Sequence, residues 1–216
     1  MSNTWITSDW HIGHRNIIKY CGRPTNCDQI ILKSLSIMKE EDTLIHLGDF
    51  GFYGTDGKVE NVFFAIPCKE KILIIGNHDE KNRKVLKLPW SKIIKRKEQP
   101  YYFTYKGLVI TAQHRPYREY PRKVHAGRWL LQKITDLFLD MKERGRLGSF
   151  LHYQQVPKDA HVALHGHSHE IGQRYDWLDG TLLVNVCVEQ FDYRPVSLVE
   201  LEQEYYARKI YMETKR

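Results

Sequence analysis

The segment Lys71-Ile-Leu-Ile-Ile-Gly-Asn-His-Asp79 joins a short apolar run to a cluster of polar residues. An apolar run of this length, bounded by a glycine, is typical of a buried β-strand, which we assign to Lys71–Ile75. The polar cluster Gly76-Asn77-His78-Asp79 follows at the carboxyl end of that strand. Because asparagine, histidine and aspartate can bind metal ions, this segment indicates both the fold and the place of a site.

Two earlier segments repeat this arrangement. Thr4–Ser8 is predicted to be a short strand that runs into Asp9-Trp10-His11. Thr43–Leu47 is predicted to be a buried strand that ends at Gly48-Asp49. Successive residues of a strand point to opposite faces, so Asp9 and His11, two apart, can share one ion.

Helices are predicted between these strands. Apolar residues recur at helical spacing in Asp28–Lys39, and Lys58–Ile66 is expected to be a helix closed by Pro67. Strands that alternate with helices indicate a layered α/β domain.

The second half of the sequence is dominated by strand-like segments. Two hairpins are predicted from segments that flank the turns Lys106-Gly107 and Asp179-Gly180. Two further segments near the end of the chain are expected to be closing strands. The predicted strands are Tyr101–Tyr105, Leu108–Ala112, Arg174–Leu178, Thr181–Val186, Val196–Leu201 and Tyr205–Met212.

A long basic segment separates the two hairpins. Within it, Ala126–Lys142 carries apolar residues at helical spacing, which indicates an amphipathic helix that packs on the core or forms a cap over a site. A chain of 216 residues can bury a core of its own. We therefore expect a single domain, residues 1–216, with a helical cap insertion at about 115–159.

The composition, with 42% hydrophobic and 27% charged residues, is ordinary for a globular protein. No apolar run approaches the ~18 residues of a membrane span, and the sequence passes from Met1 directly into a strand, without a signal peptide. We therefore expect a cytoplasmic protein that binds no membrane. The four cysteines lack metal-site spacing and are expected to be free thiols.

The net charge of +7 is unevenly distributed. Residues 81–97 hold eight Lys or Arg and no acid, and residues 115–150 hold nine Lys or Arg against four acids. Basic surfaces attract phosphate-bearing partners. The alternative is a solvated face without a partner, and the sequence does not decide between the two.

The run His165-Gly-His-Ser-His169 adds histidines to the aspartate, histidine and asparagine at the strand ends. Oxygen and imidazole donors together bind borderline divalent ions. Two such ions about 3.5–4 Å apart can hold both oxygens of a displacement at phosphorus. Any one cluster alone is weak evidence of a site, whereas all four in this order indicate a two-metal hydrolase.

The order of the clusters resembles that of the calcineurin-like metallophosphoesterase superfamily, whose pattern is D-x-H, G-D, G-N-H-[DE], a lone histidine and G-H-x-H. The matching residues are Asp9-Trp10-His11, Gly48-Asp49, Gly76-Asn77-His78-Asp79, His114 and Gly166-His167-Ser168-His169. The opening from Thr7 to His14, with Cys21-Gly22-Arg23-Pro24 after it, is similar to a small bacterial and phage branch. The resemblance implies an α/β fold with two sheets sandwiched between helices.

The resemblance also implies roles for the residues of the pattern. Asp49 would bridge two divalent ions, with Mn²⁺ preferred and Fe or Zn as alternatives. His78 would face the phosphoryl group as a catalytic residue, and Asp79 could orient its imidazole. The implied metal ligands are Asp9, His11, Asp49, Asn77, His114, His167 and His169.

The lone histidine has no motif around it. His114 follows the predicted strand Leu108–Ala112, and we prefer it as the ligand for that reason. His125, His152 and His161 are its rivals. They are less favoured, because His125 lies within the predicted cap helix and the other two are less plausibly placed at a strand end.

Three basic side chains near the pattern have open roles. His165 shares the run of the last motif and is expected to be a structural or supporting residue. His14 is either a phosphate contact or a residue that packs at a helix start. Arg115 stands next to His114 in the basic segment and is expected to contact substrate.

The first functional hypothesis is a phosphoester hydrolase in which a metal-bridging hydroxide attacks phosphorus in line. After Asp49 the sequence reads Phe50-Gly51-Phe52-Tyr53-Gly54 and lacks the Asp-Arg of the protein phosphatase branch. Its aromatic residues either line a pocket for a base or pack in the core. We therefore favour a small nucleotide-type phosphoester.

The alternatives are a nuclease acting on DNA or RNA, and a pyrophosphatase. A hypothesis of a different class is a non-catalytic, basic nucleic-acid-binding protein with a vestigial site, which the charge clusters support. The sequence makes no prediction of the oligomeric state.

Overall fold

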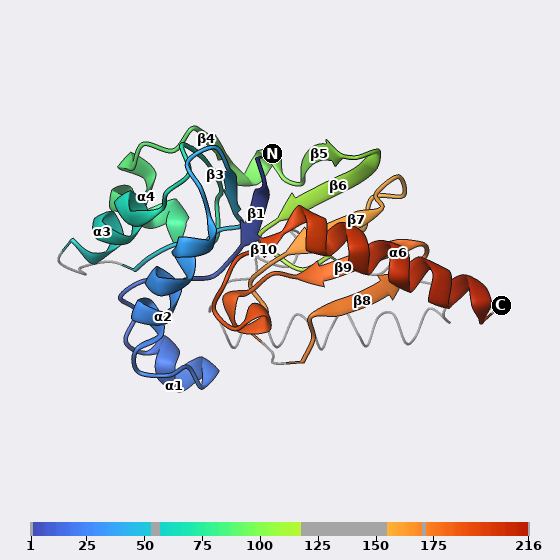
Figure 1. Ribbon diagram of the computed structural model, residues 1–216. Coiled ribbons are helices and arrows are strands. Elements are labelled where there is room, and N and C mark those ends of the chain that lie inside the picture. The colour runs from blue at the N-terminus through green and yellow to red at the C-terminus, as the bar shows by residue number, and fades with distance from the viewer. Residues whose placement is uncertain (1, 53–56, 118–154, 170–171, 216) are drawn as a thin grey trace.

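The computed structural model describes residues 2–52, 57–117, 155–169 and 172–215. In these residues the chain forms two five-stranded sheets with helices beside them (Figure 1). This arrangement confirms the expected α/β class, a two-sheet sandwich flanked by helices. The predicted helix Ala126–Lys142 and most of the expected cap at 115–159 lie outside the described residues.

The first sheet has the strand order β10-β1-β2-β3-β4, and β1 to β4 are parallel. The register pairs Thr7 with His46, and His46 with Leu73. The polar clusters that follow β1, β2 and β3 therefore meet at one edge of the sheet. The strands are β1 (Thr4–Thr7), β2 (Thr43–His46), β3 (Glu70–Ile74), β4 (Lys92–Ile94) and β10 (Val196–Ser197).

The second sheet has the order β5-β6-β7-β9-β8, in which β6, β7 and β9 are parallel. The strands β5 and β8 pair antiparallel at its edges, which confirms both predicted hairpins. The pairing of Ser8 with Cys187 brings the loop after β1 against the segment after β9. The strands are β5 (Tyr101–Tyr105), β6 (Leu108–Gln113), β7 (Val162–His165), β8 (Tyr175–Leu178) and β9 (Thr181–Asn185).

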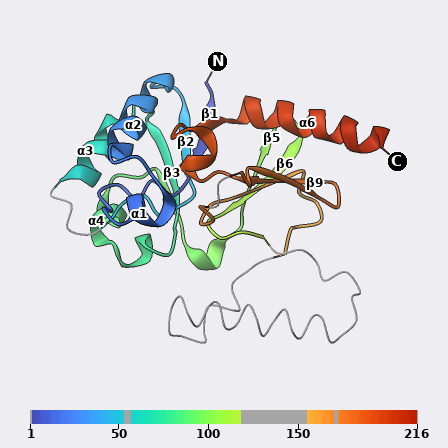
Figure 2. The same ribbon diagram turned by 90° about the horizontal axis from the view of Figure 1, so that it is seen from below.

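Helices α1 to α4 lie together on one side of the first sheet, and α6 lies along the second (Figure 2). The α-helices are α1 (Ile17–Cys21), α2 (Cys27–Ser34), α3 (Lys58–Ala65), α4 (Arg83–Lys87) and α6 (Leu198–Thr214). The 3₁₀ helices are η1 (Leu35–Ile37), η2 (Asp79–Lys81), η3 (Arg96–Glu98) and η5 (Val188–Phe191). The helices predicted at Asp28–Lys39 and Lys58–Ile66 correspond to α2 with η1 and to α3.

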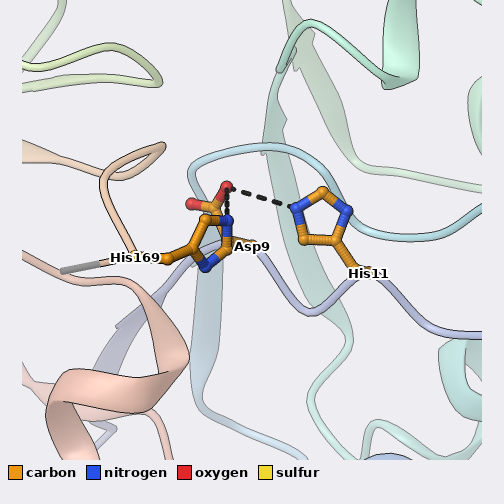
Figure 3. Close-up of side chains that lie close together, drawn as sticks. All are labelled: Asp9, His11 and His169. Atoms are coloured by element: carbon orange, nitrogen blue, oxygen red, sulfur yellow. Dashed lines mark ion pairs between the residues drawn. The ribbon is translucent and has the colours of Figure 1, made fainter. Parts of the chain in front are cut away.

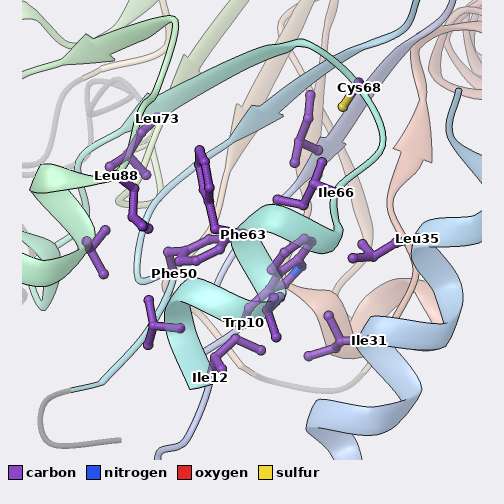
Figure 4. Packing of buried hydrophobic residues seen from close by; sticks show 14 of the residues in the cluster. Trp10, Ile12, Ile31, Leu35, Phe50, Phe63, Ile66, Cys68, Leu73 and Leu88 are labelled. Carbon is purple, nitrogen blue, oxygen red and sulfur yellow. The ribbon is translucent and has the colours of Figure 1, made fainter. Parts of the chain in front are cut away.

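The two faces of the first sheet belong to different hydrophobic clusters. The outer face packs against α2, α3 and α4 around the fully buried side chains of Trp10, Phe50 and Phe63 (Figure 4). The inner face shares a second cluster with the second sheet and α6, and Ile6, Ile74 and Val184 are fully buried there. The two sheets are thus joined by apolar packing, and their strand ends are held in fixed relation.

The prediction of closing strands at Val196–Leu201 and Tyr205–Met212 is wrong, because most of these residues form α6. Only Val196–Ser197 form a strand, β10. The Ser197 hydroxyl accepts the Glu200 N–H at 3.2 Å, and the Glu200 carboxylate accepts the Ser197 N–H at 2.9 Å. This reciprocal capping starts the helix. The buried side chains of α6 are three and four positions apart, at Leu198, Leu201 and Tyr205.

None of the helices in the described part of the chain is both long and apolar enough to cross a bilayer. The four cysteines are free thiols.

Candidate metal centre

Four of the expected site residues have a left-handed backbone. The φ angles are 58° at Asp9, 50° at His11, 54° at Asp49 and 67° at His167. This conformation is uncommon outside glycine and costs about 1–3 kcal/mol per residue, so it persists only where the surroundings enforce it. The loops after β1, β2 and β7 are therefore held in sharp turns at the residues expected to bind metal.

Asp9, His11 and His169 form the first cluster (Figure 3). Oδ1 of Asp9 lies 3.7 Å from Nε2 of His11 and 3.6 Å from Nε2 of His169. The other carboxylate oxygen, Oδ2, accepts hydrogen bonds from the His167 N–H, the Cys187 thiol and the Ser8 hydroxyl. Oδ1 is buried, and no donor in the described part of the chain makes a hydrogen bond to it.

The donor set of this cluster fits a divalent metal ion. The distances of 3.6–3.7 Å are too long for hydrogen bonds. Ligand atoms lie ~2.0–2.2 Å from such an ion, so two of them can be up to ~4.4 Å apart. Burial lowers the pKa of His11 to about 4, so its imidazole is neutral and able to bind metal. A cation would also satisfy the buried oxygen of Asp9.

Asp49, His114 and His167 form the second cluster. Nε2 of His114 lies 3.5 Å from Oδ2 of Asp49 and 3.0 Å from the side-chain oxygen of Asn77. Nδ1 of His114 donates to the Leu47 carbonyl at 2.7 Å, because a carbonyl can only accept. Burial lowers the pKa of His114, which favours the neutral ring, so Nε2 faces the cluster without a proton. The rings of His114 and His167 are 5.1 Å apart.

Asp49 belongs to the second cluster and also borders the first. Its Oδ2 is 3.7 Å from Nε2 of His11 in the first cluster and 3.5 Å from Nε2 of His114 in the second. Its Oδ1 accepts the His78 N–H at 2.8 Å, which fixes the carboxylate relative to the loop after β3. The position is the one expected of a carboxylate shared by two ions.

Two glycines allow the loops to approach the carboxylates. A Cβ at Gly76 would overlap the side chain of Asp49, and a Cβ at Gly166 would overlap those of Ser8 and Asp9. Any larger residue at these two positions would displace a candidate ligand. The glycines of the sequence motifs thus have a packing role in the site.

Asp79 corrects an expectation from the sequence. Its buried carboxylate accepts the N–H groups of Asp49 at 2.7 Å, Gly76 at 3.0 Å and Phe50 at 3.1 Å. Burial and then the nearby Asp49 carboxylate raise the pKa of Asp79 to about 7. Both oxygens are engaged with the backbone after β2 and β3, so Asp79 holds these loops rather than orienting the imidazole of His78.

His78 lies on the open side of the centre, with its side chain 39% exposed. Its Nε2 is 3.9 Å from Oδ2 of Asp49, and its ring is 5.2 Å from that of His11. His78 is more accessible than His11 and His114, whose side chains are each 3% exposed. The geometry permits a contact with substrate, and it also groups His78 with His11 and Asp49 as possible ligands of one ion.

His14 forms one wall beside the centre. Its ring stacks on Phe52, with the centroids 4.1 Å apart and the planes at 17°, and it lies 6.2 Å from the ring of His78. Burial, followed by the charges of Arg23 and His169, lowers the pKa of His14, which favours the neutral form of its imidazole. His14 is thus close enough to contact a substrate that reaches His78.

The other candidate residues are Arg115, His165 and the three rivals of His114. Arg115 is buried, and its positive charge helps to lower the pKa of His114, after the larger effect of burial. His165 approaches the carbonyl of Gly166 and belongs to neither cluster. His161 accepts the Val109 N–H and packs on Tyr205, so it is no rival to His114 as a ligand. His125 and His152 lie outside the described residues.

Sequence reasoning missed two residues at the centre. Glu189 lies 2.7 Å from Nδ1 of His169, and Arg23 forms an ion pair with Glu189 at 2.7 Å. Arg23 belongs to the segment that resembles the bacterial and phage branch, which was the available signal. Glu189 follows no motif, and nothing in the sequence pairs it with a residue 166 positions earlier.

Comparison with known proteins agrees with this geometry. The model of the calcineurin-like phosphoesterase superfamily domain matches residues 3–188. The uncharacterized protein MJ1445 of Methanocaldococcus jannaschii is 26% identical over 123 residues, 53% of this chain and 70% of that protein. The gene 66 protein of Mycobacterium phage L5 is 34% identical over 84 residues, 37% of this chain and 41% of that one.

A solved structure shares the fold. The protein of unknown function AQ665 from Aquifex aeolicus aligns with a TM-score of 0.64 and 24% identity, over 94% of this chain and 99% of that one. The family match covers most of the chain and includes both clusters of candidate ligands. The protein therefore belongs to the calcineurin-like phosphoesterase superfamily.

Proposed function

We propose that this protein hydrolyses a small phosphoester with two divalent metal ions. Membership of the superfamily implies metal-dependent phosphoester hydrolysis. The observation that carries the two-metal proposal is the place of Asp49, whose Oδ2 faces imidazoles of both clusters at 3.7 and 3.5 Å. The first ion would be held by Asp9, His11, Asp49 and His169, and the second by Asp49, Asn77, His114 and His167.

When bound, the ions would supply an activated water and would offset the negative charge of the phosphoryl group. The carboxylates of Asp9 and Asp49 balance part of the charge of such ions. His78, on the open side, would donate a proton to the leaving oxygen, a role that typically contributes ~10²–10⁴-fold. The proposed ligands are oxygen and nitrogen, which suits Mn²⁺, Fe and Zn; affinity alone does not select among these ions, and we favour Mn²⁺ on the ground of availability.

A nucleotide-type substrate is favoured by the wall formed by His14 and Phe52. Their stacked rings lie 6.2 and 6.1 Å from the ring of His78. Neutral aromatic faces beside a phosphate site suit a base that stacks on them. Phe50, by contrast, is fully buried against Trp10. Of Phe50 and Phe52, only Phe52 is therefore placed to stack on a base.

Hydrolysis assays test the proposal directly. The metal-stripped protein should be inactive on bis-p-nitrophenyl phosphate and should regain activity with Mn²⁺. A panel of nucleotide diesters, monoesters and pyrophosphates then identifies the preferred bond. Phe52→Leu should raise KM for a nucleotide diester and leave KM for a dialkyl phosphate unchanged. Protein that binds no metal and gains no activity with Mn²⁺ would refute the proposal.

A nuclease is the second candidate. The basic stretch 81–97 begins two residues after Asp79, and Lys81, Lys84 and Lys87 in it are exposed. These charges could contact the backbone of a nucleic acid that enters the centre. Cleavage of oligonucleotides at rates above those of mononucleotide diesters would favour this candidate. Metal-independent binding of oligonucleotides without any hydrolysis would instead support the non-catalytic alternative.

A further inference from the structure

The guanidinium of Arg23 lies next to the first cluster, and each of its three nitrogens donates a hydrogen bond. It donates to the carbonyls of Asp9 at 2.6 Å and Trp10 at 2.7 Å, and its Nε donates to Glu189 at 2.7 Å. The side chains of Arg23 and Glu189 are only 0% and 3% exposed. A buried ion pair is weak evidence for a gain in stability, so its role must be sought in what it holds.

Glu189 connects this pair to a candidate ligand. The oxygen that accepts from Arg23, Oε1, also lies 2.7 Å from Nδ1 of His169. The ionised carboxylate can only accept, so Nδ1 donates to it, and Nε2 is the nitrogen left to bind an ion. Nε2 is the nitrogen that faces Oδ1 of Asp9 at 3.6 Å. A carboxylate that orients a ligating histidine in this way is a recurrent feature of metal sites.

Arg23 also acts on the other two members of the cluster. Asp9 and His11 both have a left-handed backbone, and the carbonyls of Asp9 and Trp10, which Arg23 binds, lie within that turn. One guanidinium therefore holds Asp9 and His11 through the backbone and His169 through Glu189. Lysine could not replace it, because an ammonium lacks the planar array of donors.

The second cluster is held by different means. His114 is oriented by the backbone carbonyl of Leu47, and Asp49 by the N–H of His78. The hydrogen bonds and ion pairs of Arg23 and Glu189 reach Asp9, Trp10 and His169, and within the described residues none reaches Asp49, His114 or His167. The two clusters thus differ in what fixes their histidines.

We propose that Arg23 and Glu189 are positioning residues that set the affinity of the first metal site far more than that of the second. The proposal rests on the proposed function, because it takes both clusters to bind ions. The test is calorimetric titration of the metal-stripped full chain with Mn²⁺ alone, with bound metal counted by elemental analysis after dialysis. The variants are Glu189→Gln and Arg23→Lys. Arg194→Lys is the matched control, because Arg194 pairs with Glu200 at 2.7 Å at the start of α6.

The wild type and Arg194→Lys should show two binding events of unchanged affinity. Glu189→Gln and Arg23→Lys should weaken one event by about 10–100-fold and change the other much less. If Arg23→Lys does not fold, Glu189→Gln, which keeps the size of the side chain, still decides the matter. Unchanged affinities, or equal weakening of both events, would overturn the inference. A wild type that binds no Mn²⁺ would instead refute the proposed function.

Discussion

At the scale of single residues, the carboxylate of Asp49 has the greatest consequence, because it faces imidazoles of both clusters. Asp49→Ala should lower the occupancy of both ions and abolish hydrolysis. Metal content and turnover measured on the same preparation check this. Asp176→Ala, which removes an exposed carboxylate of β8, is the control and should change neither quantity. Full retention of one ion in Asp49→Ala would show that the carboxylate is not shared.

His78 should behave differently. His78→Ala removes an imidazole from the open side of the centre, so both ions should remain and kcat should fall by ~10²–10⁴-fold, the usual contribution of a general acid. Steady-state kinetics together with metal analysis separate the two effects. Loss of an ion would instead make His78 a ligand, a role that its place beside His11 and Asp49 allows.

Asp9, Asp49, Asn77 and His114 could be predicted from the sequence because they follow predicted strands, and parallel strands end at one edge. His167 and His169 were identified from their motif, since the strand before them was not predicted. The direction of a side chain could not be read in this way. Asp79 stands in a motif with His78, yet its oxygens accept backbone N–H groups. Phe50 and Phe52 are two residues apart, yet one is in the core and the other beside His14. These differences depend on packing between distant segments, which local pattern does not encode.

At the scale of elements, Asp42 ties the start of β1 to the turn before β2. Its carboxylate accepts the N–H groups of Asn3 at 2.7 Å and Lys39 at 2.9 Å, and the indole N–H of Trp5 at 2.9 Å. Asp42→Asn replaces one acceptor oxygen with a donor, and at pH 7 we expect a loss of about 2 kcal/mol in the free energy of unfolding, measured with urea.

The pH dependence of this loss follows from the pKa. Burial acts to raise the pKa of Asp42, but the hydrogen bonds from Asn3, Trp5 and Lys39 outweigh it, so the pKa is lowered. A depressed carboxyl pKa contributes stability that is present above the unfolded value and lost as the pH falls through the folded value. The difference between wild type and Asp42→Asn should therefore narrow below about pH 4. A difference that stays constant down to pH 2.5 would contradict this assignment.

Most strands were predicted, including the four-residue strands β1 and β2 and the mixed strands β5 and β8. β4, with three residues, and β7, with four, were missed. Most of α6 was predicted as two closing strands. The better signal was Ser197-Leu-Val-Glu200, a capping box that the structure uses to start the helix.

At the scale of the whole molecule, the basic stretch 81–97 should attract a charged substrate. Replacing Lys81, Lys84 and Lys87 with Gln should raise KM, and the effect should shrink with salt, because exposed charges are screened beyond ~10 Å at 0.1 M ionic strength. A small substrate engages one or two phosphates and gives a shallow salt dependence. A steep one, with efficient cleavage of oligonucleotides, would indicate a nuclease instead.

The control for this experiment replaces three exposed lysines outside the stretch 81–97: Lys33 on α2, Lys39 in the loop after η1, and Lys209 on α6. It changes the net charge equally and should leave KM unchanged. An unchanged KM in the first triple variant as well would show that the stretch is a solvated face.

Each cluster draws its side chains from both sheets. Asp9 and His11 follow β1 of the first sheet and Asp49 follows β2, whereas His114 follows β6 and His167 and His169 follow β7 of the second. An ion bound there is a cross-link between the two halves of the protein. Ligands that bind only the folded state stabilise it, by ~2.7 kcal/mol at a concentration 100 times Kd. Chelation should therefore lower the melting temperature and accelerate hydrogen exchange along the junction of the sheets, so that the ions needed for chemistry also maintain the fold.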